Sequence, residues 1–144
     1  MEVRLAQPDD LRELWALAEE FVASQVALGA PDQRKVLAIG MRYGIENGEA
    51  VVVAELDGKL VGFVAWVHLP ATADGVVDGL GTFVIPGHRR ERISIALREF
   101  ALDHCRKKGH QFVNVGIMAN NIAGRISAER QGAQLMGQIY RWVL

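Results

Sequence analysis

The chain has 144 residues, of which 50% are hydrophobic and 23% are charged, and this size and composition predict one globular domain over residues 1–144. Its 16 basic and 17 acidic side chains give a net charge of −1, which excludes a general electrostatic attraction to nucleic acid or to an anionic membrane. The single cysteine, the lack of an apolar leader and the shortness of every apolar run favour a cytoplasmic protein without a disulfide or a membrane span.

The N-terminal third has the pattern of a short strand followed by two helices. Val3 and Leu5 alternate with polar residues, as in a half-buried strand, and Pro8-Asp9-Asp10 marks the start of a helix. Apolar residues then recur at helical spacing from Leu11 to about Ser24. After a break, Pro31 suits the beginning of a weaker second helix, whose apolar residues are Val36, Leu37, Ile39 and Met41.

The middle of the chain predicts adjacent strands. Asp57-Gly58 is a strong hairpin signal between strands over residues 50–56 and 59–69. Both strands are almost continuously apolar, so we expect helices to cover both faces of their sheet. A further strand over residues 76–85 contains Gly79 and Gly81, which indicate a bulge or the close approach of another backbone.

The best-marked helix is predicted over residues 91–108, with Gly109 as its C-terminal cap. Its apolar residues are expected to face the core. Four of its polar residues are expected to face solvent: Arg98, Glu99, Asp103 and Arg106.

The rest of the chain predicts a strand over residues 112–117, a short helix over 121–130 and a last strand over 135–143. The strand–helix–strand unit over 76–117 is long enough for a right-handed parallel crossover, whereas the hairpin strands must be antiparallel. The expected fold is therefore α/β, with a mixed, mostly antiparallel sheet, one parallel pair and helices on both faces. A second subunit could complete an unpaired edge at the last strand, which would make a homodimer.

The order of these elements, together with residues 84–97, resembles the GNAT superfamily of acyl-CoA-dependent N-acetyltransferases. That family's central motif runs Val-x-Pro-x-x-Arg-(Gly)-x-Gly-x-Gly-x-Ala-Leu, and Asn121 and Gly132 have the spacing of a later family helix. The resemblance covers nearly the whole chain and implies a GNAT-like sheet whose parallel pair is splayed. Five residues match the central motif in register: Val84, Pro86, Arg89, Ala96 and Leu97.

The resemblance also implies acetyl-CoA as the acyl donor. Its pantetheine arm would bond to the strand backbone before the motif, and its pyrophosphate would lie on the turn at the start of the following helix. The implied binding residues are Phe83, Val84, Ile85, Arg89, Arg90, Arg92, Ser94 and Asn121.

Three of the family's glycines are replaced here by Arg90, Arg92 and Ser94. If position 92 requires a positive φ, an arginine there costs about 1–2 kcal/mol. A charge-assisted hydrogen bond from arginine to phosphate contributes about 1.5–3 kcal/mol, which offsets that strain. Two interpretations stay open: a rebuilt loop in which guanidinium groups replace backbone contacts, or a solvated helix start.

The sequence offers fewer candidates for catalytic residues than for residues that bind the acyl donor. At the family's tyrosine position this chain has Ala128, or Ser127 in the neighbouring register, and a serine is a poor general acid although it could hydrogen-bond the sulfur. Asp78 is the nearest carboxylate on the motif strand and a candidate base, with a loop or strand-edge role as the alternative. His68 ends the preceding strand and is either a proton acceptor near the amine entrance or a structural residue. No metal site is predicted, because no Cys or His cluster has ligand spacing.

The sequence therefore predicts an N-acetyltransferase that moves an acetyl group from acetyl-CoA to a primary amine of a small-molecule or peptide acceptor. The alternative is an inactive GNAT-like binding module, whose turn from Arg89 to Arg92 would hold an acidic partner. Neither a membrane nor nucleic acid is an expected partner, given the net charge.

Overall fold

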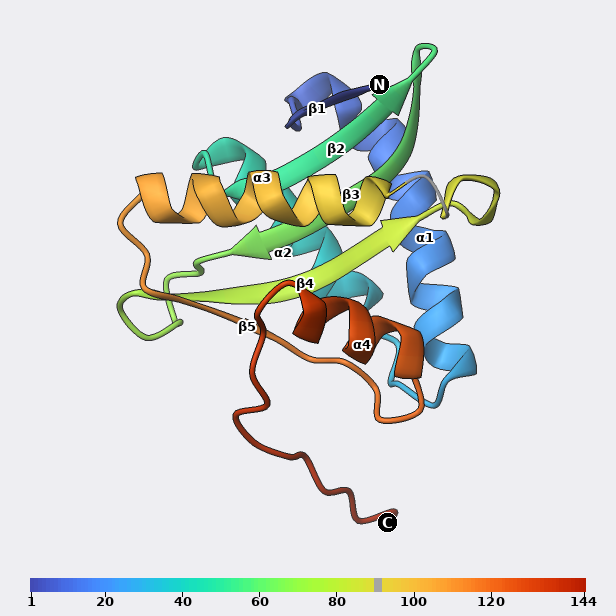
Figure 1. Ribbon diagram of the computed structural model, residues 1–144, viewed down its shortest axis with the longest axis vertical. Helices are drawn as coiled ribbons and strands as arrows, with labels where there is room; N and C mark the ends of the chain where they lie inside the picture. The colour runs from blue at the N-terminus through green and yellow to red at the C-terminus, as the bar shows by residue number, and fades with distance from the viewer. Residues whose placement is uncertain (90–91) are drawn as a thin grey trace.

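The computed structural model describes residues 1–89 and 92–144. Within them a five-stranded sheet has the order β1-β2-β3-β4-β5, and β4 and β5 are its parallel pair while the other neighbours are antiparallel (Figure 1). The predicted α/β class, with one parallel pair in a mostly antiparallel sheet, is confirmed. The strands are β1 (Glu2–Leu5), β2 (Ala50–Leu56), β3 (Lys59–Val67), β4 (Val76–Val84) and β5 (Phe112–Val115).

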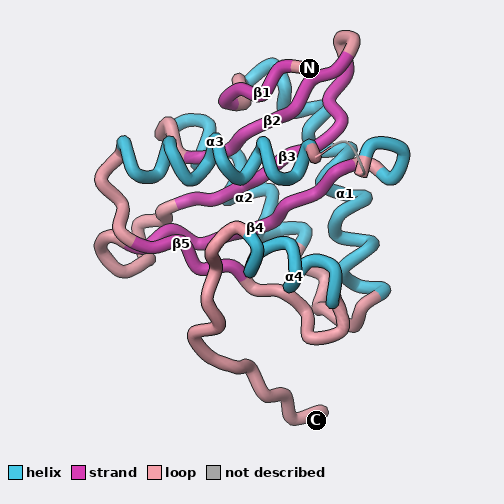
Figure 2. Tube along the Cα trace, viewed as in Figure 1, coloured by secondary structure: helices cyan, strands magenta, loops and turns pink. Residues whose placement is uncertain are grey.

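Helices lie on both faces of the sheet, as expected. α1 (Leu11–Ala27) and α2 (Arg34–Glu46) cover one face, and α3 (Ile93–Lys107) covers the other with α4 (Ile122–Arg130) beside it (Figure 2). Two short 3-10 turns precede helices, at Pro8–Asp10 and Pro86–His88. In the part of the chain that the structure describes, no helix combines the length and the hydropathy that a bilayer span requires.

Each face of the sheet has its own hydrophobic core. Val51 and Val53 of β2 point into the core under α1 and α2, whereas Val52 and Ala54 point into the core under α3. Because successive residues of a strand point to opposite faces, the uninterrupted apolar run of β2 fills both cores. The second helix begins at Arg34 rather than at Pro31, and Val36 and Ile39 on it are exposed because only one side of α2 meets the sheet.

The predicted turn and bulge are both present. Asp57 and Gly58 have φ of 52° and 78°, as in a type I′ hairpin turn. Pairing between β3 and β4 passes from Ala65 opposite Gly81 to Trp66 opposite Gly79, so the residue between the two glycines is the extra residue of a bulge.

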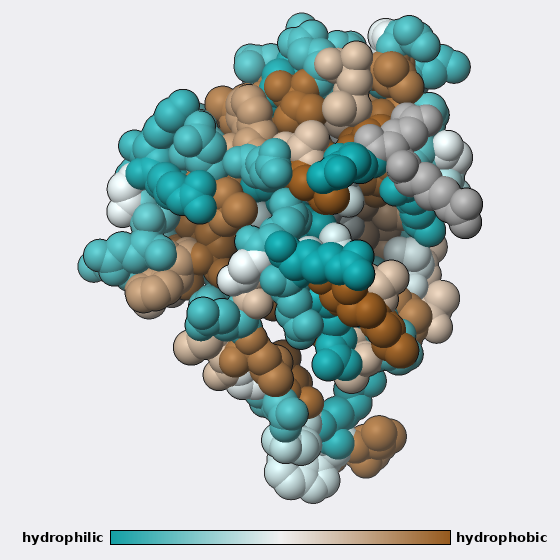
Figure 3. Space-filling view, in the orientation of Figure 1, coloured by the Kyte–Doolittle hydropathy of each residue, from teal (hydrophilic) through white to brown (hydrophobic). Residues whose placement is uncertain are grey.

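The last predicted strand is wrong. Residues 133–144 form neither helix nor strand, and the segment extends away from the body of the molecule (Figure 1). Hydrophobic side chains are visible on the surface along it (Figure 3), and Trp142, within the predicted strand, is 86% exposed. Alternating apolar residues form a strand only beside a hydrogen-bonded neighbour, and no described segment pairs with these residues. Completion of the sheet edge by a second subunit stays a prediction.

A polar cluster lies at the end of the sheet where β4 and β5 begin. The buried Glu49 carboxylate is 3.4 Å from Lys108 Nζ and 3.3 Å from His110 Nε2. The rings of His110 and His68 are 5.2 Å apart, and His68 Nδ1 lies 2.6 Å from the carbonyl oxygen of Val76. These contacts favour the structural interpretation of His68.

Gly79 marks the last paired position of β4 and β5, opposite Val115. A Cβ on Gly79 would overlap the Val115 side chain and lie 3.2 Å from the backbone oxygen of Asn114. We expect Gly79→Ala to push the two strands apart and lower the free energy of unfolding by about 1–3 kcal/mol, measured by urea denaturation. Gly116→Ala is the matched control, since a Cβ there meets no atom within 4 Å. Equal stability of the two variants would contradict this expectation.

Candidate functional site

The candidate site arises where β4 and β5 separate. The two strands pair only from Val76 and Phe112 to Gly79 and Val115, after which β4 continues to Val84. On its other side β4 stays paired with β3 as far as Val84. Residues 80–84 therefore have one edge bonded to β3 and one edge without a strand partner in the described structure, where backbone N–H and C=O groups are available to a ligand.

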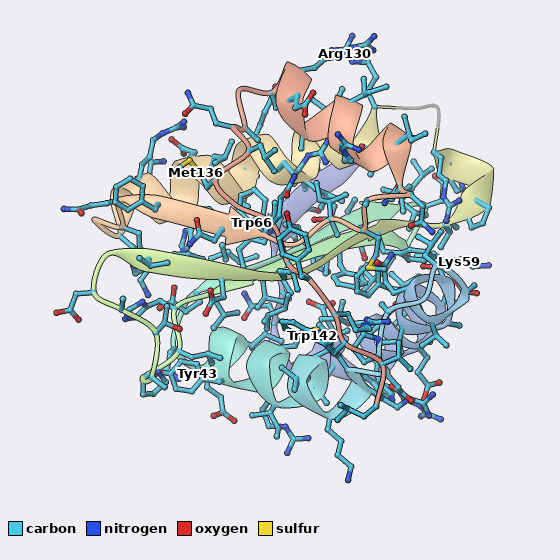
Figure 4. The ribbon with its side chains drawn as sticks, turned by 90° about the horizontal axis from the view of Figure 1, so that it is seen from below. Tyr43, Lys59, Trp66, Arg130, Met136 and Trp142 are labelled. Carbon is cyan, nitrogen blue, oxygen red and sulfur yellow. The ribbon has the colours of Figure 1, made fainter. Side chains whose placement is uncertain are left out.

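This open edge forms one wall of a cleft of about 410 Å³, which falls in the size range of small-ligand sites. The other walls come from α1, α3 and α4; Figure 4 shows α1 and α2 on one side of the sheet and α3 and α4 on the other. A second hollow of about 840 Å³ lies between α3 and α4, but no residue of the β4 edge lines it. Six predicted site residues line the smaller cleft: Phe83, Val84, Arg89, Ser94, Asn121 and Ser127.

Three other predicted residues lie elsewhere. Ile85 packs against both hydrophobic cores, and Arg92 lines the larger hollow together with Ser127, which borders both spaces. Asp78 lies near the start of β4, about 20 Å along the strand from Val84. Arg90 lies outside the described residues.

The start of α3 is open to an anion. Arg92 precedes the helix with φ 59° and ψ 21°, the left-handed conformation that costs a non-glycine residue about 1–2 kcal/mol. Among the described residues no side chain caps this end and none in the first turn is acidic, so the N–H groups of Ile93 and Ser94 lack helical acceptors. The helix dipole and these donors favour a bound anion.

Arg89 links the turn before α3 to the end of β4. Its Nε donates to the carbonyl oxygen of Val84 at 3.0 Å, and its guanidinium carbon lies 5.5 Å from the centre of the Phe83 ring. The charge of Arg89 is therefore held at the cleft wall by its own strand, which gives this residue a positioning role besides the predicted phosphate contact.

Asn121 directly precedes α4, and Ser127 lies on it. Asn121 Oδ1 accepts a hydrogen bond from the Gly124 N–H at 3.1 Å and so caps the helix, and Ser127 lines the cleft from the same helix. A Cβ on Gly124 would lie 2.6 Å from Asn121 Nδ2, so the cap requires this glycine. The structure gives Asn121 a capping role, and its contact with an acyl donor stays a prediction.

Asp78 has a local partner. Its Oδ2 accepts from the Thr72 hydroxyl at 2.9 Å, within the loop that joins β3 to β4. None of the residues that line the cleft in the described structure is a carboxylate. This geometry favours the loop role of Asp78 over that of a base.

Arg98 was predicted to face solvent, and that prediction is wrong. It lies half-buried in the cleft, where its Nη2 donates to Ser127 Oγ, because α4 packs beside α3 and covers this side of the helix. A usable signal was present in the sequence: Arg98 follows Ser94 by four residues, and residues so spaced share a helix face.

Metal ligation has no support in the part of the chain that the structure describes, where no three His, Cys, Asp or Glu side chains are grouped to hold an ion.

Comparisons with solved structures show the same fold. The PaiA N-acetyltransferase of Thermoplasma acidophilum, solved with coenzyme A, superposes with a TM-score of 0.77 at 17% identity, over 96% of this chain and 92% of that one. The aminoglycoside N-acetyltransferase AAC(6')-Iy, solved with the bisubstrate analogue CoA-S-monomethyl-acetylneamine, superposes with a TM-score of 0.75 at 16% identity, over 99% of this chain and 97% of that one. A ribosomal-protein-alanine N-acetyltransferase from Brucella melitensis biovar Abortus 2308 superposes with a TM-score of 0.69 at 22% identity, over 100% of both chains.

Sequence comparison supplies the family. No curated protein sequence matches significantly. The model of the acetyltransferase (GNAT) family matches residues 10–133, which include α1, the splayed strands, α3 and α4. The chain therefore belongs to the acetyltransferase (GNAT) family.

Proposed function

We propose that this protein is an acetyl-CoA-dependent N-acetyltransferase that acetylates a primary amine of a small molecule or peptide in the cytoplasm. The observation that carries the proposal is one cleft that joins the unpaired edge of β4 to the uncapped start of α3. Similar folds have been solved with coenzyme A or an analogue of it. The acceptors that those proteins' names indicate range from aminoglycosides to a ribosomal-protein alanine, so the proposal extends to amines as a class.

The residues present fit acetyl-CoA. Backbone groups of Phe83 and Val84 would bond to the amide-bearing arm, as a neighbouring strand would. The N–H groups of Ile93 and Ser94, with the Arg89 guanidinium that lines the same cleft, would hold the pyrophosphate. Arg92 would reach it from the larger hollow, which shares Ser127 with the cleft. When bound, acetyl-CoA supplies the acetyl group as a thioester.

In the reaction, the neutral amine nitrogen bonds to the thioester carbonyl carbon and the C–S bond breaks, leaving its electron pair on sulfur. A backbone N–H near Val84 would polarise the carbonyl, and the cleft walls would hold the reacting groups in place. Ser127 would hydrogen-bond the sulfur. Water would accept the amine proton, since no carboxylate among the described residues lines the cleft.

A specific observation supports a second candidate, an inactive module that holds an acidic partner. Arginines replace glycines in the motif turn, and Ser127 or Ala128 replaces the tyrosine. The two candidates differ in their affinity for acetyl-CoA, which can be measured without knowing the acceptor.

Isothermal titration calorimetry with acetyl-CoA tests the proposal. We expect micromolar binding that weakens about 10- to 100-fold in Arg92→Ala, because a charge-assisted hydrogen bond of about 1.5–3 kcal/mol is lost. Lys59→Ala removes an exposed cation from the β2–β3 hairpin (Figure 4) and should bind like the unmodified protein. No heat at millimolar acetyl-CoA would contradict the proposal and favour the acidic-partner module.

The left-handed backbone conformation of Arg92 leads to a prediction about stability. Arg92→Gly should have a free energy of unfolding about 1 kcal/mol higher than Arg92→Ala, because glycine adopts φ near 59° without strain while alanine does not. Urea denaturation measures the difference, and both variants lack the guanidinium, so charge cannot explain it. Equal stability of the pair would show that position 92 carries no backbone strain.

A further inference from the structure

Arg98 is a cation inside the cleft whose hydrogen-bonding capacity is only partly used. Its Nη2 donates to Ser127 Oγ, while its Nε is buried and has no hydrogen-bond partner. No carboxylate among the described residues forms an ion pair with it. Burial lowers the pKa of this guanidinium, since removal from water disfavours its charged form. An anion in the cleft, which the guanidinium lines, would offset that desolvation.

The position of Arg98 along α3 indicates which part of acetyl-CoA it faces. The proposed phosphate site lies at the start of the helix, beside Arg92, and Arg98 is six residues further on, a rise of about 9 Å. Its partner Ser127 projects from α4 on the far wall of the cleft. With the phosphates at the helix start, the Arg98–Ser127 pair faces the part of the donor that leads toward the thioester.

Resting on the proposed function, we propose that Arg98, together with Ser127, stabilises the coenzyme A thiolate that forms when the thioester C–S bond breaks. The N–H groups of the guanidinium that line the cleft donate to the sulfur, and the Arg98 bond to Ser127 Oγ leaves the serine O–H to donate as well. The arginine stays protonated throughout, and the thiolate takes its proton from water on release. Arg98 thereby supplies by charge the stabilisation that a serine cannot supply by acidity.

The test measures the ionisation of bound coenzyme A and needs neither acceptor nor turnover. The ultraviolet absorbance of the thiolate is followed against pH for coenzyme A bound to the protein, with the desulfo-coenzyme A complex as the blank. The protein's own thiol does not interfere, because burial raises the pKa of Cys105 to about 11.

We expect the thiol of bound coenzyme A to have a pKa at least about one pH unit below that of free coenzyme A, since a nearby cation favours the thiolate. In Arg98→Met this lowering should disappear, and in Arg98→Lys part of it should remain. Arg106→Met is the matched control, an exposed arginine two turns along the same helix, and should titrate like the unmodified protein.

Calorimetry separates the ways in which the proposal could fail. Above the pKa of the free thiol, the unmodified protein should bind coenzyme A about tenfold more tightly than desulfo-coenzyme A, and Arg98→Met should lose this preference. Equal weakening of both ligands by Arg98→Met, with an unchanged thiol pKa, would assign Arg98 to a phosphate and overturn the inference. Tight binding with an unshifted thiol in the unmodified protein would overturn it as well. No binding of either ligand would instead remove the proposed function on which it rests.

Discussion

The open edge of the candidate site depends on the unequal lengths of two paired strands. β5 contributes four residues and β4 nine, so the second half of β4 has a row of backbone groups that no parallel neighbour in the described structure satisfies. Such groups cannot be buried alone without a large free-energy cost, and the edge must meet water or a ligand. The bulge between Gly79 and Gly81 increases the local twist of β4 at the point where the two strands part.

Positive charge is concentrated beside this edge although the chain as a whole is nearly neutral. Arg89 is fixed to β4 and Arg98 to α4, so two of the cations that would attract an anion also hold the cleft walls together. Arg92 differs, because its backbone rather than its side chain shapes the turn. A substitution among these residues therefore acts on local structure and on ligand affinity together.

The sequence was most informative where a local pattern has one physical solution. Asp57-Gly58 predicted a hairpin, and Gly79 and Gly81 of β4 predicted a bulge. The motif in residues 84–97 predicted a turn between β4 and α3. It was least informative where orientation depends on a distant element. Arg98 looks like a solvent-facing helix residue until α4 is packed beside it, and residues 135–143 look like a strand until the absence of a described neighbour is known.

Side-chain contacts hold the parallel pair more firmly at the end where β4 and β5 begin than at the cleft end. Glu49, Lys108, His110 and His68 tie the start of β5 to the neighbouring strands. At the opposite end, no strand pairing joins β4 to the chain after β5 in the described structure. Local opening requires less free energy where fewer contacts must break, so we expect the two strands to separate more easily at the cleft end than at the end where they are paired. Such local opening would admit a long, flexible ligand without unfolding either core.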